Sequence, residues 1–166
     1  MLKTLPLILA FVAFVAAPAF AKTLKPPNDD FAVATIDVPD SWKPEAIDNG
    51  FEAESSDMAV YLSAVVVGTE KSLNAEIADT FKYLKEHKVE LDESTKKEQK
   101  FTVNGVEASE LVYQGKDEDG PATISIALVP INNKLVIFTY WASTEEEKKH
   151  SKEVGAIVTS LKPAGS

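Results

Sequence analysis

The two histidines, His87 and His150, are the only imidazoles in the chain, and the chain contains no cysteine. Zinc and copper sites combine several His or Cys ligands at short spacings, and neither histidine has such a companion, so a site for either metal is not expected. His87 falls in the last turn of a predicted helix, where a positive charge interacts favourably with the helix dipole. His150 follows Glu146 by one turn and is predicted to be its surface partner.

The loop KDEDG, residues 116–120, offers Asp117 and Asp119 as the candidate cation ligands. Closely spaced carboxylates before a glycine can wrap oxygen atoms around calcium, but the loop lacks the remaining positions of an EF-hand, including its distal bidentate glutamate. Asp and Gly are also ordinary residues of tight turns. We therefore favour a plain turn here, and expect neither a bound metal nor a cofactor.

The sequence offers little support for catalysis. Thiol chemistry is excluded by the missing cysteine, and there is no Gly-x-Ser-x-Gly elbow, dinucleotide fingerprint or phosphate-binding loop. Acidic residues are abundant, yet glycoside hydrolysis needs two carboxylates at a defined separation in a pocket, which abundance alone does not provide. We expect a protein that is not an enzyme, and a hydrolase of envelope polymers is the weakest alternative.

The candidate interaction residues are two aromatic and three acidic side chains. Trp42 and Trp141 lie near the ends of predicted strands, where a large ring can seal the edge of a core. We favour this plug interpretation for Trp42, although Trp is also frequent among interface anchors. The run of Glu145, Glu146 and Glu147 begins a predicted helix, where it complements the dipole, and is expected to project towards solvent or a partner.

Residues 1–21 have the features of an export signal. Lys3 precedes an apolar stretch over 5–15, and Ala19, Phe20 and Ala21 form the small-x-small pattern cut by signal peptidase. The apolar stretch is shorter than the roughly 20 residues needed to span a bilayer. The sequence therefore predicts cleavage after residue 21 and a mature protein of an extracytoplasmic space, the bacterial periplasm being favoured.

The remaining composition suits one acidic domain. A net charge of −9 repels polyphosphate backbones and anionic lipid surfaces, so nucleic-acid binding is disfavoured, although such acidity also serves plain solubility. Residues 22–30, KTLKPPNDD, are predicted to form a flexible N-terminal arm. The single domain is expected over 31–162, followed by a tail over 163–166.

Hydrophobic periodicity predicts alternating strands and two helices. Helical spacing of Leu73, Ile77, Phe81 and Leu84 predicts the first helix, capped by Thr69 or Ser72, and the charged segment 88–100 is interpreted as its link to the next strand. Asn104-Gly105 predicts a tight hairpin within four consecutive antiparallel strands. Strands are expected near residues 31–38, 51–55, 58–67, 101–103, 106–114, 123–129 and 135–141.

A last helix closes the predicted domain. Ser143 and Glu146 match a capping box, and the apolar stripe consists of Val154, Ile157, Val158 and Leu161. Strands with apolar residues on both sides require cover on both faces. We therefore predict an α+β fold in which an antiparallel sheet of six or seven strands carries helices on both faces, an α-β-α sandwich.

The opening FAVATIDVPDSW, residues 31–42, together with this order of elements up to residue 161, resembles the PsbP-like superfamily, which includes the Ran-binding Mog proteins. The bacterial exported branch, whose members are of unknown function, is the most similar. The resemblance implies an α-β-α sandwich and an accessory or assembly role without catalysis. No Ran-binding or photosystem-binding residue can be matched in this sequence.

These observations favour an exported, non-catalytic accessory or interaction module that binds another exported or envelope protein. The alternative is a binder of a small ligand or of calcium, with a pocket between the sheet and a helix or a site at the Asp117 loop. The two hypotheses differ in whether the bound partner is a protein or a small ligand or ion, and the sequence does not distinguish them.

Overall fold

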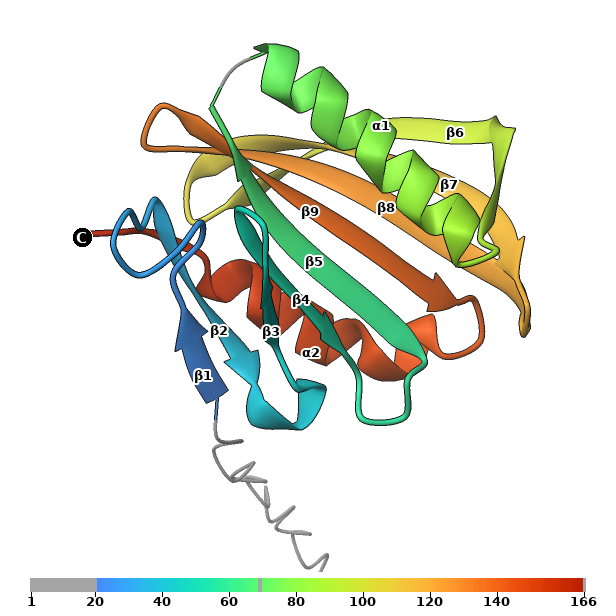
Figure 1. The fold of residues 1–166 in the computed structure, drawn as a ribbon. Helices are drawn as coiled ribbons and strands as arrows, with labels where there is room; N and C mark the ends of the chain where they lie inside the picture. Colours follow the sequence, from blue (N-terminus) through green and yellow to red (C-terminus); the bar gives the residue numbers. More distant parts are fainter. Residues whose placement is uncertain (1–20, 69, 166) are drawn as a thin grey trace, which may run out of the picture.

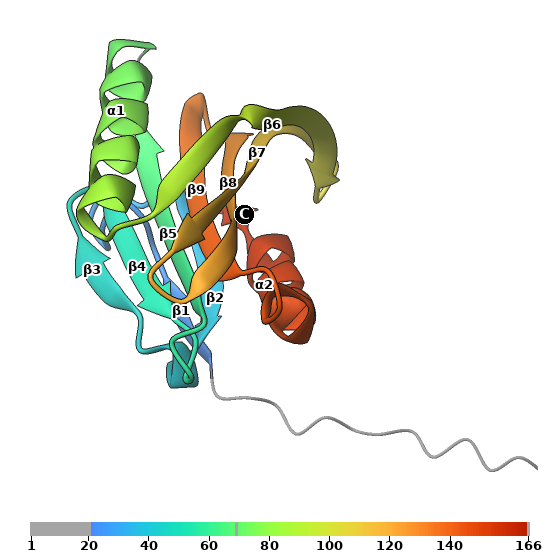
Figure 2. The ribbon, with the colours of Figure 1, turned by 90° about the vertical axis from the view of Figure 1, so that its right-hand side faces the viewer.

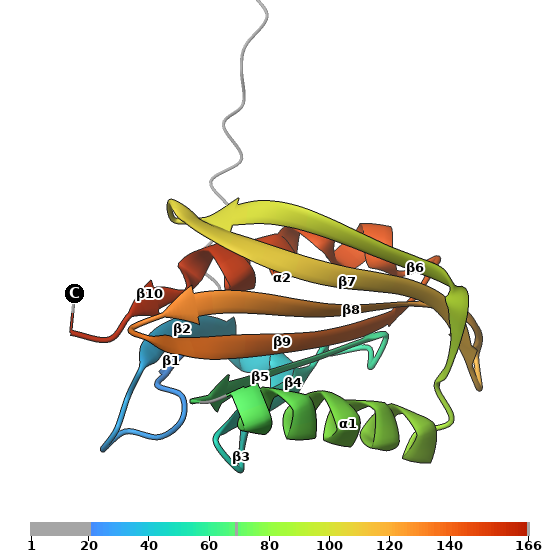
Figure 3. The same cartoon turned by 90° about the horizontal axis from the view of Figure 1, so that it is seen from above.

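The computed structural model describes residues 21–68 and 70–165. Helix α1 (Glu70–Glu86) covers one face of a twisted sheet and helix α2 (Glu147–Ser160) covers the other, as Figures 1, 2 and 3 show from three sides. The α-β-α arrangement predicted from the sequence is therefore confirmed. The predicted signal peptide and the Thr69 cap lie outside the described residues, apart from Ala21. No helix among the described residues is long and apolar enough to span a membrane.

The main sheet has seven strands, all antiparallel to their neighbours, in the order β3-β4-β5-β9-β8-β7-β6. The four consecutive strands predicted in the second half are adjacent in this sheet. The strands are β3 (Glu45–Ile47), β4 (Gly50–Glu54), β5 (Val60–Val67), β6 (Glu90–Val103), β7 (Val106–Asp117), β8 (Gly120–Ile131) and β9 (Lys134–Ser143).

Short turns fix the register of these hairpins. Asn104 and Gly105 both have positive φ (50° and 83°), as the predicted tight turn between β6 and β7 requires. Asn132 and Asn133 do the same between β8 and β9, with φ of 49° and 59°. Because asparagine tolerates the left-handed region better than most residues, Asn-Asn can replace Asn-Gly there.

The charged segment 88–100 is not the linker that we expected. It forms most of β6, which pairs with β7 with a register shift between Asp92 and Lys97. β6 is the outer strand of the sheet, and charged side chains are typical of edges because they discourage pairing with other chains. The charges that obscured the strand in the sequence therefore follow from its edge position.

Side-chain alternation divides the core between the two faces. The largest hydrophobic cluster includes Leu62 and Phe138 of the sheet and joins them to Ile157 of α2 and to Leu161. On the α1 face lie two smaller clusters, one around Leu84 and one around Ile137. The stripe predicted for the last helix is confirmed, since Ile157 and Leu161 are buried and its other members pack against the same cluster.

A second, small sheet corrects the description of the N-terminal segment. β1 (Ala21–Leu24) and β10 (Lys162–Pro163) pair on either side of β2 (Ala34–Pro39). Residues 22–30 therefore contain a paired strand rather than a wholly loose arm, and the strand expected over 31–38 starts later and joins this sheet, not the main one. The boundary predicted at residue 31 therefore lies between β1 and β2, and the boundary predicted at residue 163 lies within β10.

The start of α2 also differs from expectation. Glu146 already has helical φ and ψ, and no side-chain hydrogen bond caps the helix. Ser143 is the last residue of β9, and its carbonyl accepts the Glu146 backbone N–H. The predicted capping box is therefore wrong, because a three-residue turn and not the Ser143 hydroxyl starts the helix.

Candidate functional site

Trp42 closes the core on the α2 side. The turn Asp40–Trp42 directs its ring inward, where it is 1% exposed and belongs to the large cluster. Its indole Nε1 donates to Glu153 Oε2 at 3.1 Å, and its ring meets that of His150 edge-on with centroids 6.1 Å apart. Trp42 is therefore a buried plug, and a ring with this burial has no free surface for an interface contact.

His150 is buried, not the surface partner of Glu146 that we expected. It is 7% exposed, and its Nε2 and Nδ1 lie 3.0 Å from Asp57 Oδ2 and 3.2 Å from Glu153 Oε2. Burial alone would lower the pKa of His150, but the hydrogen bonds to Glu153 and Asp57 outweigh it and raise the pKa above its ordinary value. The charged imidazole thus ties α2 to the β4–β5 turn.

The same corner contains the residues that most resemble a metal site. Within the described chain, ligand atoms of Asp57, Glu146 and His150 lie within 4.8 Å of one another. Lys149 Nζ lies 2.7 Å from Asp57 Oδ2 and 3.1 Å from Glu146 Oε2, so an ammonium already supplies the positive charge. Hydrogen bonds from Lys149, Ser55 and His150 hold the pKa of Asp57 well below its usual range. The arrangement is a structural clamp.

The Asp117 loop forms a compact turn between β7 and β8. Asp117 Oδ1 accepts the backbone N–H groups of Asp119 at 2.9 Å and Gly120 at 3.1 Å, as in an Asx turn. Its Oδ2 accepts the Trp141 indole N–H at 3.3 Å. Asp117 and Asp119 are not brought together with a third ligand in the described part of the chain. Both Asp117 oxygens therefore serve the fold.

The three glutamates at the start of α2 do not form a common projecting face. Glu145 is exposed, whereas Glu146 pairs with Lys149. Glu147 Oε2 accepts the Thr123 hydroxyl at 3.0 Å and so faces the sheet. Two of the three carboxylates are thus engaged within the molecule.

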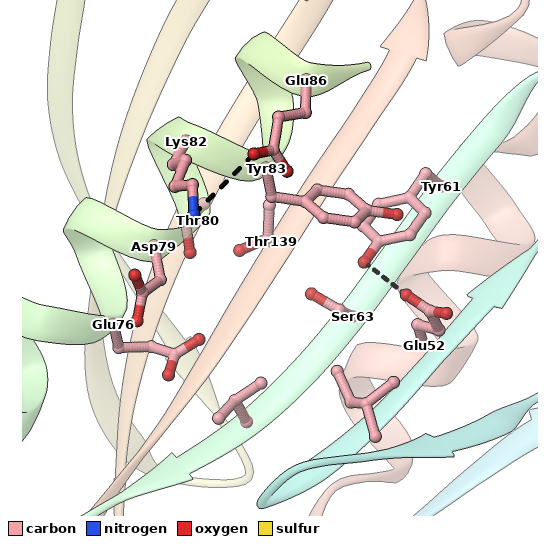
Figure 4. Close-up of a pocket in the computed structure, with 12 residues that line it drawn as sticks. Glu52, Tyr61, Ser63, Glu76, Asp79, Thr80, Lys82, Tyr83, Glu86 and Thr139 are labelled. Carbon is pink, nitrogen blue, oxygen red and sulfur yellow. Dashed lines mark hydrogen bonds and ion pairs between the residues drawn. The ribbon is translucent and has the colours of Figure 1, made fainter.

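An open groove lies between α1 and the sheet, where strands β3, β4, β5 and β9 contribute side chains (Figure 4), and we call it the α1 groove. Its cavity has a volume of about 490 Å³, within the range of ligand pockets. The groove is lined by Ile47, Glu52, Tyr61, Ser63, Val65, Glu76, Asp79, Thr80, Lys82, Tyr83, Glu86 and Thr139.

Stacked aromatic rings form one end of the α1 groove. Tyr61 of β5 lies between Tyr83 of α1 and Trp141 of β9, with ring centroids 5.3 Å and 5.0 Å away. His87 follows the last residue of α1 and packs on Tyr83 with centroids 4.1 Å apart. The rings therefore join the helix to the sheet at this end, and Tyr61 and Tyr83 line the groove.

Acidic side chains lie in the α1 groove, and one of them contacts the stacked rings. The Tyr61 hydroxyl donates to Glu52 Oε2 at 3.0 Å (Figure 4). Burial is the main cause that raises the pKa of Tyr61 and of Tyr83, so both phenols stay protonated at neutral pH. Partial burial, and then the neighbouring Asp79, raise the pKa of Glu76. The α1 groove thus contains one carboxylate, that of Glu76, whose charged form the surroundings disfavour.

Two further cavities define the surroundings. One of about 420 Å³ shares Glu52, Tyr61 and Tyr83 with the α1 groove and extends it towards the β4–β5 turn. Another, of about 470 Å³, lies between α2 and the sheet and is largely apolar. Its acidic side chains are paired internally, Glu110 with Ser125 and Glu147 with Thr123. The carboxylates of Glu76 and Asp79, for which the described residues provide no such partner, therefore distinguish the α1 groove from the α2 cavity.

Sequence reasoning singled out Trp141 and considered a pocket between the sheet and a helix, but it did not identify the residues that line the α1 groove. Tyr61, Ser63 and Val65 alternate along β5 and so share the face opposite Leu62 and Ala64. This alternation was visible in the predicted strand, but the other residues that line the groove come mainly from α1 and β4. Their meeting depends on how the helix lies across the sheet, which no local pattern encodes.

Comparisons with known proteins support the fold. No protein-family model and no curated protein matches the sequence. Among solved structures, the chain is similar to the solution structure of cyanobacterial PsbP (CyanoP) from Synechocystis sp. PCC 6803, with a TM-score of 0.57 at 11% identity over 90% of this chain and 95% of that one.

Two further structures are similar at lower scores. The Ran-binding protein Mog1p of Saccharomyces cerevisiae gives a TM-score of 0.49 at 10% identity, over 87% of this chain and 96% of that one. A protein of unknown function from Pseudomonas aeruginosa gives 0.47 at 14% identity, over 88% and 99%. The likeness to cyanobacterial PsbP carries the assignment: the described residues have the PsbP-like fold, as the resemblance at residues 31–42 predicted.

Proposed function

We propose that this chain is a non-catalytic module, exported to an extracytoplasmic space such as the bacterial periplasm, that binds another protein through the α1 groove. The export signal pattern over residues 1–21 supports the location. The PsbP-like fold is compatible with an accessory role but names no partner.

The observation that carries the proposal is the open, acidic α1 groove beside a firmly packed core. Its ionisable groups are carboxylates, one lysine and two tyrosines whose raised pKa values keep them neutral. Neither imidazole lines it, because His150 is buried on the other face and His87 packs on the outer end of α1. Such a set of groups suits recognition better than acid–base or nucleophilic chemistry.

Site-specific photo-crosslinking in the native host tests this proposal. A photoreactive amino acid replaces Lys82, which is 72% exposed at the rim of the α1 groove and whose ion pair with Glu86 is worth little. The matched control replaces Lys100, which is 71% exposed on β6. We expect a discrete protein adduct from position 82 and none from position 100. Equal adducts from both positions, or none from position 82, would refute the proposal.

A further inference from the structure

We infer that the α1 groove takes a long cationic side chain, lysine or arginine, presented by an extended segment of the partner protein. This inference rests on the proposed function and specifies what the partner must carry. It follows from the charge, the free hydroxyls and the shape of the groove.

The charge of the groove is not balanced within the molecule. Four carboxylates line it, against the single ammonium of Lys82, which lies 3.8 Å from Glu86. No ion pair among the described residues involves Glu52, Glu76 or Asp79. A cation placed between them would gain attraction from each, and would relieve the repulsion between Glu76 and Asp79 that helps to raise the pKa of Glu76.

The free hydroxyls of two largely buried threonines provide an independent reason. Thr139 is 4% exposed and Thr80 8% exposed, both line the groove, and no hydrogen bond among the described residues involves either hydroxyl. Figure 4 shows the Thr139 hydroxyl among the groove side chains. Neither oxygen is fully enclosed, because the Thr144 hydroxyl is the one fully buried side-chain polar atom without a partner in the described part of the chain. Both hydroxyls are therefore free to accept hydrogen bonds, and ammonium and guanidinium groups carry several donors for such acceptors.

The shape favours a side chain on a peptide over a small free amine. Ile47, Val65 and the ring of Tyr61 offer an apolar wall along which the methylene stem of lysine or arginine can pack while its charged end meets the acids. The adjoining cavity shares Glu52, Tyr61 and Tyr83 with the groove and leaves room for the residues that flank the basic one. A polyamine would use the acids but not this extension.

Nuclear magnetic resonance titration of the isotope-labelled mature protein tests the inference. The probe is the tripeptide acetyl-Leu-Arg-Val-amide, and its matched control replaces arginine by neutral citrulline, which keeps the shape. We expect amide shifts in β4, β5 and residues 76–86 with arginine, and at least about tenfold weaker binding with citrulline, corresponding to about 1.4 kcal/mol. Equal binding of the two peptides, or shifts confined to another face, would overturn the inference.

Variants separate specific binding from attraction to an acidic protein. Glu76→Gln should weaken the arginine peptide at least about fivefold, whereas Glu107→Gln, whose carboxylate pairs with Lys100 on the exposed β6–β7 hairpin, should leave it unchanged. Equal losses in both variants would contradict a specific site. Spermidine is the third probe, and tighter binding of spermidine than of the peptide would reject a protein side chain as the occupant.

The two tests fail in distinguishable ways. If the peptide does not bind but crosslinking from position 82 still gives a discrete adduct, the module binds a protein through the α1 groove by other chemistry. If the adduct is absent while the arginine peptide binds, the groove recognises a cation and the protein-binding function is wrong.

Discussion

The two faces of the sheet are covered by helices of similar length but differ in how they are packed. On the α2 face, Trp42, Ile157 and Leu161 join a single large cluster, and the His150 clamp fastens the start of the helix. On the α1 face, two smaller clusters leave a groove in which the carboxylates of Glu76 and Asp79 have no ion pair among the described residues. The α2 face stabilises the fold, and the α1 face retains groups that fold stability does not require.

The two tryptophans give the largest expected contrast between the faces. Trp42→Ala removes a ring that is 1% exposed, and we expect it to lower the free energy of unfolding by about 3–5 kcal/mol. Trp141→Ala on the α1 face removes a half-buried ring stacked on Tyr61, and should cost about 1–2 kcal/mol. Urea denaturation monitored by circular dichroism measures both.

Equal losses in the two variants would remove the distinction between the faces. Phe31→Ala serves as the baseline, because Phe31 is an exposed aromatic residue and its loss should change stability by less than about 0.5 kcal/mol.

Much of the fold could be predicted from the sequence because local patterns specify its strands and turns. The β-branched run over 60–67 and the Asn104-Gly105 turn specify a strand and a hairpin with little help from the rest of the chain. β1 and the charged first part of β6 were missed because side-chain character does not reveal the backbone pairing there. Leu24 is the one residue of β1 that packs against the core, and β6 carries the charges of an edge strand.

The site was less readable because it is made by distant segments. Trp42 was correctly expected to be a plug, since a large ring after a strand end has few other places to go. His150 was misplaced because its partner Asp57 lies 93 residues earlier in the chain, whereas Glu146 is only one turn away. Glu76 and Asp79 were visible as polar residues of a helix, but the unpaired state of their charges appears only in three dimensions.

Changing the pH should weaken the α2 face through its clamp. Since the folded-state pKa of His150 is raised above the ordinary value of 6.5, its contribution to stability is fully present below about pH 6.5 and is lost as the pH rises through the folded-state value. The difference in unfolding free energy between the wild type and His150→Gln should therefore shrink between pH 6 and pH 9. Urea denaturation across this range, with the imidazole followed by nuclear magnetic resonance, measures it.

The carboxylates around His150 supply the check. Asp57 and Glu153 contact the ring, and Lys149 contacts Asp57, so Asp57→Asn should reduce the pH dependence by removing one negative charge beside the imidazole. A difference that grows with pH would mean that His150 is stabilised in its neutral form and that the clamp is not ionic.

The smallest effect should have the opposite sign and comes from the α1 groove. Burial and Asp79 raise the pKa of Glu76, so its charged form is disfavoured in the folded state at neutral pH. Glu76→Gln should therefore increase the free energy of unfolding at pH 7, by less than about 0.5 kcal/mol because solvent screens the site, and the gain should vanish near pH 4. Urea denaturation at both pH values, with Glu107→Gln as the exposed control, measures this change in the free energy of unfolding.

A loss of stability in Glu76→Gln would mean that Glu76 stabilises the fold, and the proposed difference between the two faces of the sheet would be wrong. A gain, together with weaker binding of the arginine peptide, would show that Glu76 contributes to recognition at a cost in stability, as expected of a binding residue on the α1 face.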